Sequence, residues 1–152
     1  MVEIDRIEDA RIPELLELYR ATWWAAERTA DDVRTLVRHS DLVIGLVDEG
    51  SDRLVAFARV LTDRTCFAMI FDVIVAPGHR GTGLGRLLME RVLGRPELTA
   101  VGSIELVCQP DLVAFSEQFG FSTDVGTSLL MRRTSDPRLQ SATHNETRPP
   151  TN

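Results

Sequence analysis

A glycine-rich segment, residues 80–85, stands between two stretches with different hydrophobic patterns. Residues 69–75 are apolar except for Asp72, which is typical of a buried strand, and residues 84–93 place apolar side chains at helical spacing. A strand that enters a helix through such a turn exposes the first N–H groups of the helix, which have no partner inside it. These groups and the positive end of the helix dipole bind phosphate. The sequence therefore predicts a phosphate site at this turn.

The spacing of the glycines excludes the two commonest phosphate loops. A P-loop ends in Gly-Lys-Ser/Thr, and the chain contains no lysine. The dinucleotide fingerprint requires Gly-x-Gly-x-x-Gly, whereas Gly81, Gly83 and Gly85 alternate. Arg80 adds a planar cation that suits phosphate. These features indicate a phosphorylated cofactor that is bound in another way.

The pattern Arg80-x-x-Gly83-x-Gly85 resembles the coenzyme-A signature of the GNAT acetyltransferase superfamily, Q/R-x-x-G-x-G/A. Residues 114–121 are similar to the late helix of that family and to its Gly-Phe ending. The resemblance covers residues 1–133. It implies an α/β fold with a mixed, mostly antiparallel sheet that is flanked by helices and splayed between strands 4 and 5. Acetyl-CoA would lie in that splay.

The resemblance also assigns the groups that would hold acetyl-CoA. The end of the fourth strand would bind the pantetheine amides through its main chain, and the turn would bind the pyrophosphate through its N–H groups. The strand residues are Val73, Ile74 and Val75, and the turn residues are Arg80, Gly81, Thr82, Gly83, Leu84, Gly85 and Arg86. The alternative for the three glycines is a flexible loop that only caps a helix.

The resemblance implies an N-acetyltransferase in which a primary amine, of a small molecule or a protein, attacks acetyl-CoA directly in a ternary complex. The amine must lose a proton, and Asp72 is the one carboxylate in the apolar run of the fourth strand. Pairing with a nearby Arg59 is the alternative role for Asp72. Glu27 is a weaker candidate base. Trp23 and Trp24 could wall the acceptor pocket and bind a cation, or they could simply pack at a helix end.

The proton donor is the point at which the chain departs from the family pattern. Many members carry a tyrosine in the late helix that protonates the leaving thiolate, and here Ser116 stands at that position. Tyr19 is the only tyrosine of the chain and belongs to a different predicted element. The substitution permits a slow enzyme, another donor such as Cys108, or a non-catalytic CoA-binding sensor or structural module.

Hydrophobic patterning along the whole chain predicts the element order β-α-α-β-β-β-α-β-α-β. Asp9 and Thr29 are expected to cap the first two helices, and Pro110 to begin the last one. Strands are expected at 2–7, 42–47, 54–61, 67–76 and 104–108, with a last strand or strands in 121–132. We expect residues 1–133 to form a single domain and the polar, proline-containing residues 134–152 to form a flexible tail.

Composition narrows the set of partners. The net charge of −6 argues against a nucleic-acid partner and is compatible with a cationic acceptor. No apolar run approaches the length of about 18 residues needed to span a bilayer, and the N-terminus does not resemble a secretory signal. Cys66 and Cys108 are expected to be buried free thiols, which favours a reducing, cytoplasmic location. No metal is expected, and the resemblance suggests a homodimer.

Overall fold

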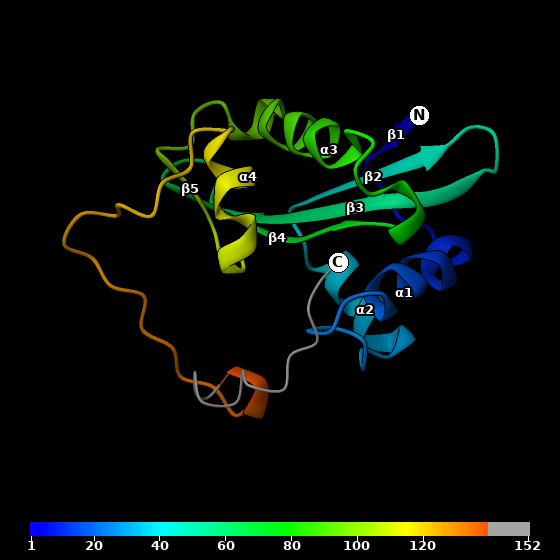
Figure 1. Cartoon of the computed structure of the whole chain (residues 1–152), viewed down its shortest axis with the longest axis horizontal. Coiled ribbons are helices and arrows are strands. Elements are labelled where there is room, and N and C mark those ends of the chain that lie inside the picture. Colours follow the sequence, from blue (N-terminus) through cyan, green and yellow to red (C-terminus); the bar gives the residue numbers. More distant parts are fainter. Residues whose placement is uncertain (140–152) are drawn as a thin grey trace. The chain divides into compact units, whose positions relative to one another are not determined.

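Five strands form one sheet in which the order in space follows the order in the chain. The computed structural model describes residues 1–139, and the sheet lies in the first of two units, Met1–Phe121 (Figure 1). Neighbouring strands are antiparallel except for the last pair, which is parallel. The mixed, mostly antiparallel sheet predicted from the sequence is confirmed. The strands are β1 (Val2–Ile4), β2 (Leu42–Asp48), β3 (Arg53–Thr62), β4 (Phe67–Val75) and β5 (Ser103–Leu106).

Helices cover both faces of this sheet. Two of them pack on one face and α3 packs on the other, as Figure 1 shows. The α-helices are α1 (Ile12–Arg20), α2 (Ala30–Arg38), α3 (Leu84–Leu93) and α4 (Val113–Glu117). Short 3-10 turns are η1 (Asp9–Arg11), η2 (Pro77–His79), η3 (Pro96–Leu98) and η4 (Pro110–Leu112), with η5 (Pro137–Leu139) in the second unit.

The strand β3 lies at the centre of the fold, because residues 54–60 are all buried. Apolar side chains therefore pack on both of its faces. On one face, Leu88 and Val92 of α3 join a core with Val60. On the other face, the core around α1 and α2 includes Leu15 and Phe57. The two cores fix the sheet between the helix layers.

Of the two helix caps predicted from the sequence, one is present. Thr29 caps α2, because its hydroxyl accepts a hydrogen bond from Asp32 N at 3.1 Å while the Asp32 carboxylate accepts one from Thr29 N at 2.8 Å. The prediction for Asp9 was wrong. Asp9 lies in η1, and α1 begins after Arg11 without a side-chain cap. The intervening 3-10 turn keeps Asp9 away from the first N–H groups of α1.

A β-bulge interrupts the pairing of β3 with β4. Arg59 pairs with Phe71 and Phe57 with Ile74, so one residue of β3 stands opposite two of β4. Asp72 lies in the bulge with φ of 55°, a left-handed conformation that costs a non-glycine residue about 1–2 kcal/mol. Adjacent residues of a regular strand point to opposite faces. Here both Phe71 and Asp72 contact Arg59, because the bulge shifts the alternation by one residue.

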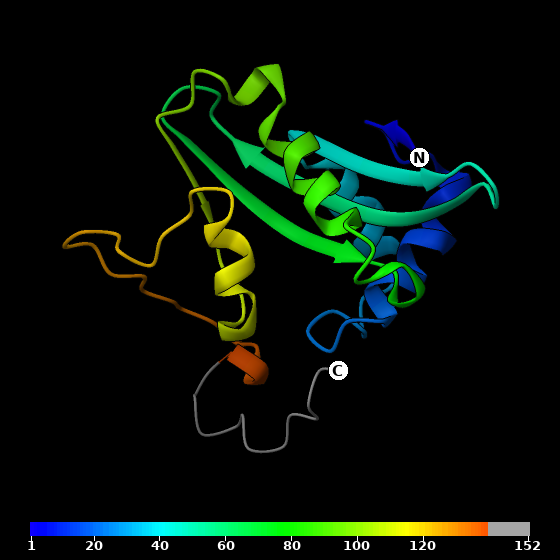
Figure 2. The same cartoon turned by 45° about the horizontal axis from the view of Figure 1, so that its top comes forward.

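The strand β5 covers only the first four residues of β4, because β5 itself ends there. Their pairing begins at Phe67 with Ser103 and ends at Ile70 with Leu106. Residues 71–75 have no strand neighbour on that side within the described chain, and Figure 2 shows the two strands diverging. The splay between strands 4 and 5 that the sequence predicted is confirmed.

The prediction of a last strand in residues 121–132 was wrong, because residues 121–134 contain no strand. A strand needs a partner for its N–H and C=O groups, and hydrophobic content alone does not supply one. The segment instead forms local turns around Asp124 and Gly126, and Leu129 and Met131 are exposed. Residues 140–152, the larger part of the predicted tail, lie outside the described residues.

Both cysteines are free thiols, but the expectation that they are buried was wrong. Cys66 is exposed and Cys108 is partly exposed. Cys66 lies in the turn between β3 and β4, where its N–H donates to the carboxylate of Asp63. The turn places it outside the apolar run that follows it in the sequence.

We expect Gly45→Ala to lower the free energy of unfolding by about 1–3 kcal/mol, because a Cβ would overpack the contact between β1 and β2. That atom would lie 2.8 Å from Ile4 Cγ1 and 2.9 Å from Leu54 Cδ1. Chemical denaturation measures the change. Gly50→Ala is the control, since its nearest neighbour is Asp48 Oδ2 at 3.6 Å, and we expect a change within about 0.5 kcal/mol. Equal stabilities of the two variants would contradict this packing.

Candidate functional site

The turn between β4 and α3 presents a series of free main-chain donors. The N–H groups of residues 81–86 have no hydrogen-bond acceptor within the described residues. Gly81 and Gly83 adopt φ of 74° and 86°, which favours glycine over residues with a Cβ. A Cβ on either glycine would meet nothing within 4 Å, so the backbone is open to an approaching ligand. Gly85 is the packed glycine of the three, since a Cβ there would contact Phe115 at 3.5 Å.

The side chains of the turn hold its shape. The exposed Arg80 donates from Nε to the carbonyl of Val75 at 3.2 Å, which folds it back over the end of β4. Thr82 Oγ1 donates to the carbonyl of His79 at 2.7 Å. Arg86 donates to Gln118 at 2.8 Å and its guanidinium lies over Phe119, so its side chain joins α3 to the region of α4. Leu84 is buried beneath the turn.

These features fit a diphosphate. Six consecutive N–H groups that have no acceptor among residues 1–139, at the N-terminus of a ten-residue helix, favour an anion through hydrogen bonds and through the helix dipole. The preceding residues, Val73, Ile74 and Val75, belong to the part of β4 that β5 does not cover. Their main chain could therefore pair with an extended ligand in the way a further strand would. The residues predicted for CoA thus lie along one continuous stretch from β4 into α3.

A second constellation surrounds Asp72, on the face of the sheet that α1 and α2 cover. Its Oδ2 accepts three hydrogen bonds, from Tyr19 at 2.8 Å, from Arg28 Nη1 at 3.0 Å and from Arg59 Nε at 2.5 Å. The Asp72 side chain is 5% exposed and that of Arg59 is 9% exposed. The pairing with Arg59 that the sequence offered as the alternative is therefore present. Whether Asp72 also acts as a base stays a prediction.

Tyr19 is fully buried and remains protonated. Burial, and then the negative charge of Asp72, raise the pKa of its phenol far above the ordinary value. The hydroxyl therefore donates to Asp72 as a neutral group. Its ring packs against Phe57 and Trp24, and the Arg28 guanidinium lies 4.5 Å from the ring centroid.

Sequence analysis missed Tyr19 and Arg28 as members of this site. Tyr19 comes from α1 and Arg28 from the connection that leads into α2, and both reach a carboxylate in β4. The available signal was the buried Asp72 itself, because a buried carboxylate requires donors that its own strand cannot supply.

The two tryptophans have different surroundings. Trp24 is partly buried, and the Arg28 guanidinium lies 5.4 Å from its ring centroid. Trp23 is exposed, and so is Glu27. One face of Trp24 is thus occupied by a cation of the same chain. The predicted roles of Trp23 and Trp24 toward an acceptor, and of Glu27 as a base, stay predictions.

Ser116 is buried in α4, and its hydroxyl donates to the carbonyl of Leu112 at 3.1 Å. To protonate a leaving thiolate, the hydroxyl would have to give up this bond. The role of Ser116 as proton donor stays a prediction, and this hydrogen bond does not favour it.

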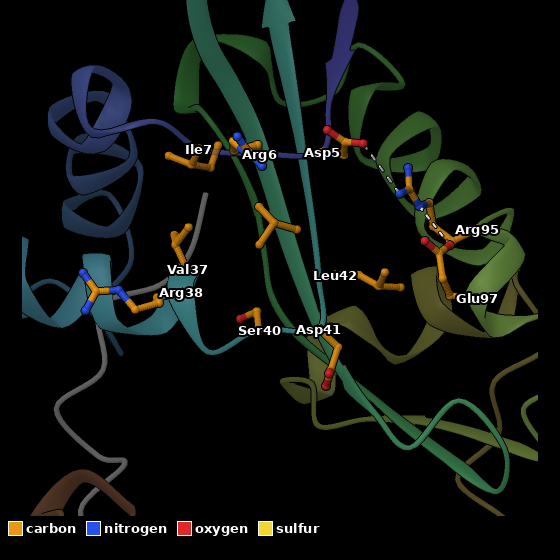
Figure 3. Close-up of a pocket in the computed structure, with 11 residues that line it drawn as sticks. Asp5, Arg6, Ile7, Val37, Arg38, Ser40, Asp41, Leu42, Arg95 and Glu97 are labelled. Carbon is orange, nitrogen blue, oxygen red and sulfur yellow. Dashed lines mark ion pairs between the residues drawn. The ribbon is translucent and has the colours of Figure 1, made fainter.

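A cavity of about 430 Å³ lies elsewhere in the first unit (Figure 3). Its lining comes from the chain after β1, from the link between α2 and β2, and from the chain after α3. Ion pairs join Arg95 to Asp5 and Glu97. None of the residues predicted for CoA or for catalysis lines it. Within residues 1–139, no three His, Cys, Asp or Glu side chains cluster as a metal site requires, and no helix is long and apolar enough to cross a membrane.

The fold and the turn together define an acyl-CoA-dependent acyltransferase architecture, and comparison with known proteins gives the family. Residues 5–121 match the acetyltransferase (GNAT) family. The uncharacterized N-acetyltransferase ycf52 of Porphyra purpurea is 30% identical over 125 residues, which are 81% of this chain and 71% of that protein. A crystal structure assigned to the GNAT acetyltransferases, from Xanthomonas campestris pv. campestris, is 30% identical with a TM-score of 0.73, covering 88% of this chain and 94% of that one.

The chain therefore belongs to the GNAT acetyltransferase family and is an acyltransferase. The family predicted from the glycine turn is confirmed. A further relative is serotonin N-acetyltransferase 2, chloroplastic, of Oryza sativa subsp. japonica, which is 37% identical over 100 residues. That match covers 64% of this chain and half of the rice protein.

We expect Arg80→Ala combined with Gly83→Val to raise the dissociation constant for CoA at least about tenfold, because the variant loses a cation and a Cβ must enter a left-handed position. Isothermal titration with CoA measures the constant, and circular dichroism checks the fold. Gly78→Ala is the control, since a Cβ there meets nothing within 4 Å and its φ is not left-handed. A folded double variant with unchanged affinity would exclude this turn as the CoA site.

The raised pKa of Tyr19 predicts that no phenolate forms in the native protein around pH 10, where an exposed tyrosine titrates. Since the chain has a single tyrosine, ultraviolet absorbance during alkaline titration reports this group alone. The unfolded state loses the proton first, so the contribution of Tyr19 to stability is complete below about pH 10 and falls as the pH rises further. Phenolate absorbance that appears before unfolding would show that Tyr19 is not held in this way.

Proposed function

We propose that this chain is an N-acetyltransferase in which a primary amine attacks the thioester of acetyl-CoA directly, with both substrates bound together. The observation that carries the proposal is the run of six N–H groups at residues 81–86 that have no acceptor in the described part of the chain and that follow the uncovered part of β4 after one short 3-10 turn. A diphosphate at the turn places the remainder of an extended ligand along β4. That geometry suits CoA better than a compact nucleotide phosphate.

The reaction forms one C–N bond and breaks one C–S bond. An alkylammonium ion with a pKa of about 10.4 must first lose a proton, since only the neutral amine has a free electron pair. The amine nitrogen then bonds to the acetyl carbon, and the electron pair of the C–S bond leaves with sulfur. The products are the N-acetyl amine, CoA as the thiol and one proton. No covalent bond to the protein is required.

Asp72 is the proposed acceptor for the hydrogen bond of the amine. Its Oδ2 is occupied by three donors, whereas Oδ1 has no hydrogen-bond partner in the described chain. The three donors fix the carboxylate, so that Oδ1 keeps one orientation. In this proposal Asp72 orients the amine and passes its proton to solvent, directly or through a water molecule. Glu27 keeps a weaker role as an alternative base.

Protonation of the leaving thiolate is the step for which the site provides the fewest suitable groups. Ser116 already donates to Leu112, so its help to sulfur requires that this bond break. A thiol of pKa about 8.5 leaves acceptably without a donor, and general acid assistance adds about 10²–10⁴ in rate. We therefore infer slow but real turnover. A CoA-binding module without catalysis is the second candidate, and the hydrogen bond from Ser116 to Leu112 favours it.

For the acceptor we propose a chemical class, and the location and oligomeric state of the protein stay predictions. We propose a small primary amine or a protein amino group as acceptor, and the rice relative is named for an amine, serotonin. A cytoplasmic location, a homodimer and the absence of a nucleic-acid partner stay predictions, and the name of the rice relative points to the chloroplast in its own case.

The experiment that tests the function follows release of the CoA thiol when the protein is incubated with acetyl-CoA and a panel of primary amines. Release above background with any amine, together with the matching N-acetyl product by mass spectrometry, supports the enzyme. Calorimetric binding of CoA without release across the panel supports the module. Thermal protection by ATP or NAD and none by CoA would overturn both.

For Asp72→Asn we expect a lower kcat and a flatter dependence of kcat on pH near neutrality, because the amide cannot accept a proton. Steady-state kinetics across the neutral range measures both, with denaturation to confirm folding. Glu8→Gln removes an exposed carboxylate that forms no cap hydrogen bond and should behave like the wild type. A wild-type pH profile in folded Asp72→Asn would remove Asp72 from proton transfer.

A further inference from the structure

The cluster around Asp72 carries more positive than negative charge. Arg28 and Arg59 both pair with this one carboxylate, and neither forms another ion pair within the described chain. Tyr19 is neutral, because burial raises the pKa of its phenol. The Asp32 carboxylate also interacts with Arg28, but it is exposed to solvent and forms no ion pair with Arg28 within the described residues. In the ion pairs of this cluster, two guanidinium groups thus share one carboxylate, and the side chains of Arg59 and Arg28 are 9% and 25% exposed.

Such a surplus has a physical cost. An ion removed from water loses several kcal/mol of hydration free energy. The attraction of one carboxylate does not offset that loss for two guanidinium groups. Structural pairing of Asp72 alone would need a single arginine. Stacking on Tyr19 and Trp24 also holds the Arg28 guanidinium, but the rings do not accept its remaining N–H hydrogen bonds in the way a further anion would.

The guanidinium groups have donors left for that anion. Arg59 uses only Nε in a hydrogen bond, and its Nη1 and Nη2 have no acceptor in the described chain. Arg28 uses only Nη1. The donors that remain on Arg59 are not fully enclosed, because the only fully buried side-chain atoms without a hydrogen bond in the described residues are Arg95 Nε and Glu97 Oε2. A guanidinium fork with free donors matches a carboxylate or a phosphate.

We propose that the acceptor amine carries an anionic group, a carboxylate or a phosphate, which Arg28 and Arg59 bind while Asp72 Oδ1 receives the amine. The inference rests on the proposed function and names the substrate class. It explains why two cations converge on one carboxylate. Arg28 and Arg59 are specificity-determining residues in this proposal.

A simple cationic amine fits the same cluster less well. The ring faces of Tyr19 and Trp24 that could hold a cation already carry the Arg28 guanidinium. An ammonium ion without an anionic partner would meet the surplus positive charge and be repelled. The net charge of the whole chain is −6, but exposed charges beyond about 10 Å are screened. Contact with the two guanidinium groups therefore determines which acceptor is preferred.

Four amines with similar short chains test the proposal: γ-aminobutyrate, aminopropylphosphonate, butylamine and putrescine. In the thiol-release assay we expect kcat/KM for at least one anionic amine to exceed that for butylamine by about tenfold or more, as a charge-assisted hydrogen bond allows. Preference between γ-aminobutyrate and aminopropylphosphonate distinguishes a carboxylate from a phosphate ligand. Equal or better use of butylamine or putrescine overturns the proposal and leaves the proposed function standing.

Reversing the charge of Arg28 should increase activity toward a cationic amine, and a folding defect cannot cause such an increase. Arg28→Glu should lower the preference for the anionic amine over butylamine about tenfold and raise the use of putrescine. Arg38→Glu is the matched control, because Arg38 is exposed at the end of α2, forms no ion pair in the described chain and gives the same change in net charge. If Arg28→Glu does not fold, Arg28→Gln should show the loss of preference alone. An unchanged preference in the folded variant overturns the proposal.

Two failures remain distinguishable. Thiol release from butylamine or putrescine alone rejects the anionic acceptor only. Absence of release from all four amines and from the wider panel, with CoA bound, rejects the enzyme itself and with it the inference.

Discussion

The left-handed backbone at Asp72 is the constraint on which the site depends. In a regular strand, Asp72 would point away from Arg59 and into the core beneath α3, among side chains such as Leu88. A carboxylate there would lack a donor and cost several kcal/mol. The bulge costs about 1–2 kcal/mol for φ of 55°, and it turns the carboxylate to the face where Tyr19, Arg28 and Arg59 reach it. The smaller cost decides the local structure, and it brings residues from three elements to one oxygen atom.

The same part of β4 also serves the other half of the site. Beyond Ile70, β4 has no strand neighbour on the side of β5 within the described chain, and five residues after β4 ends at Val75 the chain enters the glycine turn at Arg80. An edge with free N–H and C=O groups is a place where another extended chain can pair. This edge of β4 is uncovered because β5 has only four residues, all of which pair with residues 67–70, and the bulge lies within the uncovered stretch. The edge proposed for ligand pairing and the carboxylate proposed for proton transfer therefore belong to one segment of β4.

The parts of the structure that sequence could predict are those determined by neighbours in the chain. The glycine turn, the helix 84–93 and the capping box at Thr29 depend on residues within a few positions of one another, and all three are present. The bulge left no such signal, since nothing in the run around Asp72 requires a left-handed residue. The contacts of Asp72 with Arg28 and Tyr19 join residues 44 and 53 positions apart. The strand expected in 121–132 failed for the related reason that a strand depends on a partner, which the apolar residues Leu129 and Met131 do not provide.

Composition and local geometry give opposite indications about the acceptor, and distance decides between them. The net charge of −6 is spread over carboxylates such as Asp31 and Glu49 that are exposed to solvent, where a Debye length of about 8–10 Å limits their reach. The two guanidinium groups at Asp72 act at contact distance and in a medium of lower dielectric constant, so their interaction with a bound group is several times stronger. The global charge can then raise the encounter rate of cations without selecting them. Selection belongs to the cluster, and a group that satisfies Asp72 Oδ1 and the free guanidinium donors together must carry both a hydrogen-bond donor and an anion.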